Sequence, residues 1–352
     1  MTVIEHVDMG APASFVWDYD ARRPRLNKLY EKSKTSQWNA TTDIDWSIDI
    51  DPGHISEELL ARFAAADFDF ESTAVGAFAA ASDENRWLVE AQSHAWTVSQ
   101  FMHGEQGALV ATAKICAGVE SIDDKYYAAA QVADEARHVE VYRRYLTEKL
   151  PFAFPVNPHL HTLLAQIIRE PRWDMTYLGM QIMVEGLALA AFGLMNFMNP
   201  QEPLIQQITG YVIRDEARHV AFGVLSLEEV YRQMTAAELR EREEFVIEAA
   251  HLMRDRLLME EVWERLGYDV DVWVKWSLET PFMQAFRQLL FAKIVPNLKR
   301  LGLLTPRVRE AFAKIGVLQF EDMPDSTQDE RVTVPPALAA LFPELAATAP
   351  AL

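Results

Sequence analysis

The sequence predicts an all-α fold built around one helical domain. Three observations support this prediction. Long segments carry apolar residues at the three-to-four-residue spacing of amphipathic helices, residues that favour helix N-caps precede several of them, and no segment shows the sustained apolar–polar alternation of a strand. The 14 glycines and 17 prolines among 352 residues are sparse and unevenly placed.

The chain divides into three parts. Residues 1–52 mix tryptophans with many aspartates and are expected to form an irregular N-terminal arm. Residues 53–316 carry the helical pattern and are expected to form the core domain. Residues 317–352 are expected to form a linker and C-terminal tail, with a short docking helix over 337–347.

The helices expected in the core domain follow from their caps and breaks. Ser82 or Asp83 and then Ser121 are suitable N-caps, and Thr235 with Glu238 forms a capping box. Three prolines between residues 151 and 158 indicate a break. The expected helices begin near residue 56 and then cover residues 83–118, 121–150, 171–198, 201–234, 235–266, 281–300 and 305–315.

The net charge of −19 disfavours several functions. Nucleic acid and anionic membrane surfaces repel so acidic a chain. The most apolar stretch, residues 182–195, contains Glu185 and is shorter than the roughly 18 residues of a membrane span. The N-terminus lacks a signal-peptide pattern, and Cys116 is the single cysteine. We therefore expect a cytoplasmic protein that binds neither membranes nor nucleic acid.

The pentapeptide Asp-Glu-Ala-Arg-His occurs twice, at residues 134–138 and 215–219, each time inside an expected helix. Its Glu and His are three residues apart and therefore project from one helix face. A carboxylate and an imidazole directed at one point suit an ion such as iron or manganese. The two pairs are Glu135 with His138 and Glu216 with His219.

Each pair follows a lone glutamate by about one helical hairpin. Glu105 lies 30 residues before Glu135, and Glu185 lies 31 residues before Glu216. Both lone glutamates are embedded in apolar sequence, where an ionised carboxylate is unfavourable unless it is paired or bound to a metal. Four glutamates and two histidines from four helices form the ligand set of ferritin-like di-iron carboxylate bundles.

On these residues the chain resembles the ferritin-like di-iron superfamily, over about residues 95–230. The branch it resembles activates oxygen and includes ribonucleotide reductase small subunits, ligand-binding oxidases, multicomponent monooxygenases and arylamine N-oxygenases. The resemblance implies a four-helix bundle core that holds two iron ions, or one manganese and one iron, and reacts with O₂. It implies six metal ligands, namely Glu105, Glu135, His138, Glu185, Glu216 and His219.

The resemblance also gives roles to residues beside the ligands. In that branch the Asp that precedes a ligand Glu accepts a hydrogen bond from the His ligand across the site, and metal-bound imidazoles generally need such an acceptor. Arg137 and Arg218 would neutralise the two aspartates, Asp134 and Asp215. Ordinary ion pairing on the helix surface is the alternative role for these arginines. The implied pairs are Asp134 with His219 and Asp215 with His138.

Two aromatic residues match only the reductase small subunits. Tyr142 lies four residues after His138, where those subunits carry a radical tyrosine, so a redox role stays open. Against a radical-generating protein, the first ligand is Glu105 rather than Asp, and the last tyrosine is Tyr268. Trp38 resembles a reductase Trp that packs beside the metal-site Asp, but we expect it to be a structural residue of the arm.

Other members of the branch are disfavoured at single positions. The ligand-binding oxidases crosslink a Val to a Tyr, and the matching residues are Ala108 and Met180. The arylamine N-oxygenases have a third His where this chain has Val212. This chain can therefore have neither the Val–Tyr crosslink nor the third His ligand. Apolar neighbours of the ligands, among them Phe101 and Ala188, are expected either to line a substrate pocket or to pack the bundle.

The sequence therefore predicts a non-haem di-iron or Mn/Fe oxidoreductase, and the expected activity is that of an oxygenase that hydroxylates, N-oxygenates or otherwise oxidises a small organic substrate. The alternatives are a radical-generating protein like the reductase small subunits and a ferroxidase or other metal-binding bundle. No ferredoxin or flavin motif is present, so a separate reductase is an expected partner. A homodimer is expected from the resemblance.

Overall fold

The computed structural model describes residues 4–54, 73–199 and 202–328. Every element assigned within these ranges is helical, and none of the described residues forms a strand, which confirms the all-α prediction for them. The helices expected near residue 56 and over 337–347 lie outside the described residues.

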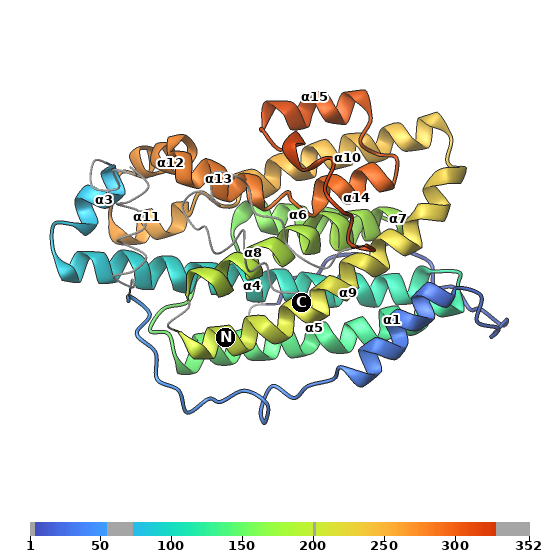
Figure 1. Ribbon diagram of the computed structural model, residues 1–352, viewed down its shortest axis with the longest axis horizontal. Helices are drawn as coiled ribbons and strands as arrows, with labels where there is room; N and C mark the ends of the chain where they lie inside the picture. Colours follow the sequence, from blue (N-terminus) through green and yellow to red (C-terminus); the bar gives the residue numbers. More distant parts are fainter. Residues whose placement is uncertain (1–3, 55–72, 200–201, 329–352) are drawn as a thin grey trace.

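Four long helical segments form the bundle (Figure 1). The first two form a hairpin around the short connection at residues 119–121, and the last two pack against each other. These are α4 (Asp83–Gly118), α5 (Ile122–Glu148), the continuous run of α7 (Trp173–Tyr177), η2 (Leu178–Val184) and α8 (Glu185–Met198), and α9 (Pro203–Gln233).

Shorter helices surround the bundle. α10 and the helices after it lie along one side of it, and α1 packs against α5 and α9 on another side (Figure 1). They are α1 (Pro24–Thr35), α3 (Ala74–Ala79), α6 (Pro158–Arg169), α10 (Ala236–Asp255), α11 (Glu260–Leu266), α12 (Val270–Glu279), α13 (Pro281–Leu289), α14 (Ile294–Arg300), α15 (Pro306–Lys314) and the 3₁₀ turn η3 (Leu318–Phe320).

The expected caps are present and explain where the bundle helices begin. The side chains of Ser82 and Ser121 accept hydrogen bonds from backbone N–H groups in the first turns of α4 and α5. Thr235 and Glu238 form the reciprocal bonds of a capping box at the start of α10. These bonds satisfy N–H groups that have no partner inside the helix, so the predicted starts are confirmed.

Two helices begin at prolines in places where no helix was expected. The arm was expected to be irregular, yet Pro24 starts α1, and the expected break at residues 151–158 is followed by α6, which starts at Pro158. Proline is favourable in a first helical turn because that turn needs no intrahelical N–H donor. We expected Pro158 to belong to a break and expected no helix in the arm.

Two expected helices are divided in the structure. The helix expected over 235–266 ends with α10, and α11 begins after Met259, whose φ of 56° is left-handed. The helix expected over 281–300 is interrupted between α13 and α14. α12, which lies between these regions, was not expected.

The segment from α7 to α8 is the most apolar of the described residues. Residues Trp173–Asn196 have the length and mean hydropathy (1.6) of a membrane-spanning helix, but 89% of the apolar stretch is buried inside the protein. It also carries Glu185 toward the bundle interior. It is therefore explained as the central helix of the core.

Within this segment η2 is a π-helix that ends immediately before Glu185. A π-helical turn inserts an extra residue into the helix and is frequent at functional sites. Gly179 lets η2 approach its neighbours, since a Cβ there would lie 2.6 Å from Ile167 Cγ1 and 2.9 Å from Phe245 Cζ. The widened turn sets the rotation at which α8 presents Glu185.

Candidate metal centre

The structure brings all six expected ligands together between the four bundle helices. α4 contributes Glu105, the first residue of α8 is Glu185, and α5 and α9 each contribute a Glu and a His one turn apart. All six side chains are buried. The two members of each ExxH pair share one helix face, and both of these faces are buried in the bundle.

The six side chains form two adjacent groups. In the first, His138 Nδ1 lies 3.2 Å from Glu105 Oε2, 3.4 Å from Glu135 Oε2 and 3.2 Å from Glu216 Oε1. In the second, Glu135, Glu185 and His219 each offer an atom within 4.8 Å of the others. His219 Nδ1 is 3.1 Å from Glu135 Oε1 and 3.6 Å from Glu216 Oε2.

Glu135 and Glu216 are thus placed to bridge two cations. Each approaches both histidines, and each directs one oxygen at His138 and the other at His219. Glu105 approaches only the first group and Glu185 only the second. Two carboxylates near both histidines, two that belong to one group each and one imidazole per group would make a dinuclear donor set of hard and borderline ligands.

The unsatisfied atoms of this cluster fit bound cations. Among the described residues, these buried atoms accept or donate no hydrogen bond: Glu135 Oε2, Glu185 Oε2, both oxygens of Glu216 and His219 Nδ1. Buried polar atoms without partners are costly, and four neighbouring buried carboxylates are more so. Two divalent cations would supply partners to these atoms and neutralise the four charges.

The pKa values of the clustered glutamates also indicate a site suited to cations. Burial raises the pKa of Glu105 and of Glu185 well above the ordinary value, and neighbouring glutamates add to the effect. Burial opposes ionisation of Glu135 too, but His219 and His138 lower its pKa. Without cations, therefore, Glu105 and Glu185 take up protons that bound metal ions would displace.

Each histidine directs its second nitrogen at an aspartate of the opposite motif. His138 Nε2 lies 3.2 Å from Asp215 Oδ2, and His219 Nε2 lies 3.2 Å from Asp134 Oδ2. These are the cross-site pairs that the resemblance implied. An acceptor at Nε2 keeps the proton there and leaves Nδ1 free to face a metal.

Arginines neutralise the two aspartates. Arg137 pairs with Asp134 one turn earlier and lies 3.7 Å from Asp215, while Arg218 pairs with Asp215 and lies 3.6 Å from Asp134. Arg218 is 1% exposed. Its ion pairs are therefore interior contacts, which rules out ordinary surface pairing for this arginine.

Trp38 corrects our expectation of a merely structural residue in the arm. It is buried, and its Nε1 donates a 2.7 Å hydrogen bond to Asp215 Oδ2. Its ring stacks on Tyr211, with 4.9 Å between ring centroids. The Arg137 guanidinium lies 5.4 Å from its centroid. The arm therefore contacts the acceptor of a candidate ligand.

Gln131 is a site residue that sequence reasoning missed. It is fully buried on α5, and its Nε2 donates to Glu135 Oε1 at 2.9 Å and to Glu185 Oε1 at 2.8 Å. Its position four residues before Glu135, and so on the same helix face, was the available signal. It holds two carboxylates of the second group in place.

Tyr142 lies in an apolar cage beside the first group. Its ring is 5.9 Å from that of Phe101 and 5.8 Å from that of Phe192, measured between centroids. Its hydroxyl has no hydrogen-bond partner among the described residues, and burial raises its pKa well above the ordinary value.

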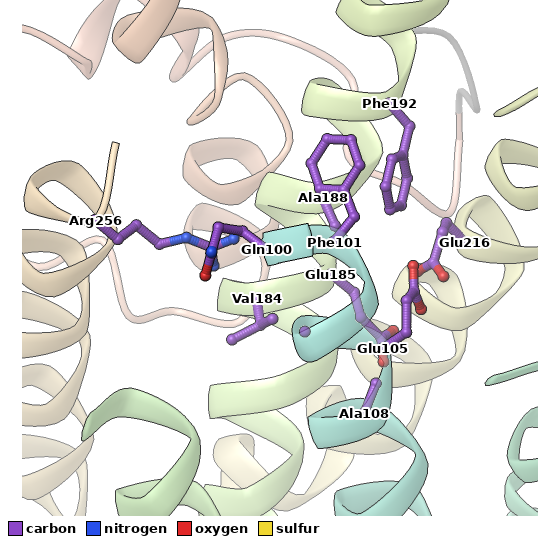
Figure 2. A pocket seen from close by; sticks show the side chains of 11 residues that line it. Gln100, Phe101, Glu105, Ala108, Val184, Glu185, Ala188, Phe192, Glu216 and Arg256 are labelled. Atoms are coloured by element: carbon purple, nitrogen blue, oxygen red, sulfur yellow. The ribbon is translucent and has the colours of Figure 1, made fainter. Parts of the chain in front are cut away.

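A pocket reaches the candidate metal centre (Figure 2). It is a small cavity that is partly open to solvent. Three of the four candidate ligand glutamates line it, and Phe101, Ala108 and Ala188 are among its apolar walls. The three glutamates that line it are Glu105, Glu185 and Glu216.

The fold and the six side chains together have the arrangement of ferritin-like carboxylate bundles with a dinuclear metal site, in which two helices each supply a Glu and two each supply a Glu-x-x-His. No protein-family model and no curated protein matches the chain.

Solved structures of R2-like ligand-binding oxidases are similar to the chain. One variant with an anaerobically reconstituted Mn/Fe cofactor is 20% identical, with 81% of this chain and 94% of that chain covered and a TM-score of 0.49. A second variant, with an aerobically reconstituted Mn/Fe cofactor, is 19% identical, with coverage of 88% and 96% and a TM-score of 0.44.

Proposed function

We propose that the protein is an O₂-dependent dinuclear metal oxidase or oxygenase, with two iron ions or one manganese and one iron, that oxidises a small organic substrate. The observation that carries this proposal is the pocket, which ends on Glu105, Glu185 and Glu216. A centre that only stores iron needs no apolar cavity at its ligands. Bound metal ions would supply the redox chemistry for reaction with O₂.

The residues of the chain would position the substrate and the ligands. Phe101, Val184 and Ala188 give the pocket apolar walls, which favour an apolar substrate group and exclude water from the reacting atoms. Gln131 fixes Glu185 on one side of the centre. Asp134 and Asp215 hold the imidazoles in one orientation.

Insertion of oxygen requires an external source of electrons. Conversion of a C–H bond to C–OH with O₂ places one oxygen atom in the product and the other in water, which consumes two electrons and two protons. A separate reductase would supply the electrons. The hydrogen-bonded series of Trp38, Asp215 and His138 would connect the half-buried Tyr211 with the centre.

The direct test is metal content combined with oxygen consumption. Protein loaded anaerobically with Fe²⁺, or with Mn²⁺ and Fe²⁺, should hold about two metal ions per chain. Addition of O₂ should change its optical spectrum, and a substrate should increase oxygen uptake beyond that of iron oxidation alone. Less than one metal ion per chain would refute the centre. Oxygen uptake that only matches the added Fe²⁺ would indicate a ferroxidase.

The cage around Tyr142 favours a second candidate function, a radical-generating protein. A buried phenol beside the centre, enclosed by the rings of Phe101 and Phe192, is protected from solvent. Electron paramagnetic resonance after O₂ exposure should then show a tyrosyl radical that is absent from Tyr142→Phe. The first proposal instead expects oxidation of the organic substrate to persist in that variant.

A further inference from the structure

Arg256 lies at the end of the pocket away from the candidate ligands. It follows the last residue of α10, is 4% exposed and lines the cavity. Figure 2 shows its side chain extending toward Gln100, with the ligand glutamates on the far side of Val184, Ala188 and Phe101.

Arg256 has no anionic partner among the described residues. Its Nε and Nη1 are buried and make no hydrogen bond. The neighbouring Asp255 binds Arg254 Nε at 2.6 Å instead. Burial lowers the pKa of Arg256 to about 10, so the guanidinium keeps its charge at neutral pH. A buried charge without a partner is strongly unfavourable, and an anion in the pocket would relieve this cost.

The residue beside Arg256 does not neutralise it. Gln100 is a neutral amide whose Nε2 donates to the Pro155 carbonyl at 2.9 Å and whose Oε1 accepts from Asn157 N at 2.8 Å. These two bonds hold Gln100 as a fixed wall of the pocket. The cavity therefore has one cationic end, an apolar middle and one end formed by the candidate ligands.

We infer that Arg256 binds the carboxylate of the substrate, so the pocket selects small organic acids with an apolar body. This inference rests on the proposed function, because it takes the pocket as the substrate site. The planar guanidinium offers paired donors that match a carboxylate. The acid group lies away from the ligand glutamates, so a carbon remote from the carboxylate faces the metal centre.

A single carboxylate suits this site better than a phosphate. One guanidinium supplies one positive charge, and no second cationic side chain lines the pocket within the described residues. A dianion would remain half-neutralised in a cavity that also contains three glutamates. The apolar walls of Phe101, Val184 and Ala188 require an uncharged remainder.

The test measures binding rather than turnover. The full-length protein, loaded with Mn²⁺ without O₂, is titrated calorimetrically with straight-chain carboxylates of four to eight carbons and with the matching neutral amides. Hexanoate should bind more tightly than hexanamide. Arg256→Met should weaken carboxylate binding roughly tenfold to a hundredfold, the range for a hydrogen bond to a charged group, and leave amide binding nearly unchanged.

Two further variants separate the role of Arg256 from effects on folding. Arg256→Lys keeps the charge but loses the paired donors, so it should bind hexanoate with intermediate affinity. Arg240→Gln removes an exposed arginine of the same helix and should leave binding unchanged. In the absence of ligand, Arg256→Met should melt at a higher temperature than the native protein, because it removes an unpaired buried charge.

Three results would overturn the inference. They are equal affinity for carboxylates and amides in the native protein, full carboxylate affinity in Arg256→Met, and equal effects of Arg240→Gln and Arg256→Met. The second result would mean that the metal ions hold the carboxylate. Failure of the proposed function looks different, since Arg256-dependent binding would then persist in a protein that never oxidises the bound acid.

Discussion

Trp38 donates its indole N–H to Asp215 Oδ2 at 2.7 Å, and the same oxygen lies 3.2 Å from His138 Nε2. One carboxylate oxygen thus joins a residue of the N-terminal arm to a candidate metal ligand in the bundle. The arm, which precedes the helical core in sequence, contributes directly to the electrostatics of the centre.

Trp38→Phe tests this connection. The variant keeps an aromatic ring against Tyr211 but leaves Asp215 without one donor. We expect metal content to be retained, reduction of the oxidised centre by an external donor to slow, and stability to fall by about 1.5–3 kcal/mol, as for a bond to a charged group. Stopped-flow reduction and urea unfolding measure these two effects.

Trp46→Phe is the matched control for Trp38→Phe. Trp46 belongs to the same arm, and its Nε1 donates to the Ala40 carbonyl at 2.7 Å, away from the centre. Its loss should leave the reduction rate unchanged. Equal slowing in both variants would show that the arm acts by packing alone and not through Asp215.

The candidate bridging and terminal glutamates should differ in their effect on metal content. Glu135 belongs to both candidate groups, whereas Glu105 belongs to one. We expect Glu135→Ala to lose most of both ions and Glu105→Ala to retain about one of two. Glu140→Ala, an exposed change on the same helix as Glu135, should retain both. Mass-spectrometric metal analysis decides, and two ions in Glu135→Ala would refute the bridging assignment.

Gln131 should influence the centre without binding metal. Gln131→Met keeps the volume of the side chain and removes both hydrogen bonds, to Glu135 and to Glu185. Loss of a residue that orients ligands typically weakens metal binding about tenfold to a hundredfold. Chelator competition measures this change. Unchanged affinity would mean that the two glutamates are held by the metals and by packing alone.

The stabilising effect of metals should grow as pH rises. In the cation-free protein the pKa values of Glu105 and Glu185 are raised by burial and those of His138 and His219 by nearby carboxylates. Groups with raised pKa values stabilise the fold while protonated, and that stabilisation is lost as pH climbs above the ordinary values. Bound cations replace the protons.

We therefore expect the melting temperature of the metal-free protein to fall from about pH 5 toward pH 8, while that of the metal-loaded protein changes little. Metal binding should release protons, and calorimetry in buffers of different ionisation enthalpy can count them. Glu135 stays ionised in this range because its pKa is lowered, so it does not reverse the sign. A metal-induced stabilisation that shrinks as pH rises would contradict this account.

The candidate ligands could be predicted from the sequence because helical geometry places residues i and i+3 on one face, and the motif occurs twice. The other residues that contact the candidate ligands or line the pocket could not be predicted in this way. For Gln131 the sequence indicated only that it shares a helix face with Glu135. Nothing in the sequence placed Arg256 opposite Glu105 in one cavity, since that depends on how α10 packs. The start of α6 was missed because Pro158 was taken for part of a break, and α1 was missed because the arm was expected to be irregular.

The π-helix before Glu185 was equally hidden from sequence, and it can be tested through Gly179. In Gly179→Ala the new Cβ would lie 2.6 Å from Ile167 Cγ1 and 2.9 Å from Phe245 Cζ. Overpacking of this kind costs about 1–3 kcal/mol, which thermal or urea unfolding would measure. Relief of the clash would shift η2, so we also expect weaker binding of a metal ion that Glu185 would hold.

Gly210→Ala is the control for Gly179→Ala. Gly210 lies inside α9, and a Cβ there meets nothing within 4 Å. Replacing a helical glycine by alanine in open space should stabilise the protein by up to about 1 kcal/mol and leave metal binding unchanged. If Gly179→Ala also stabilised the protein and kept both metal ions, the close approach of η2 to α6 and α10 would not be what positions Glu185.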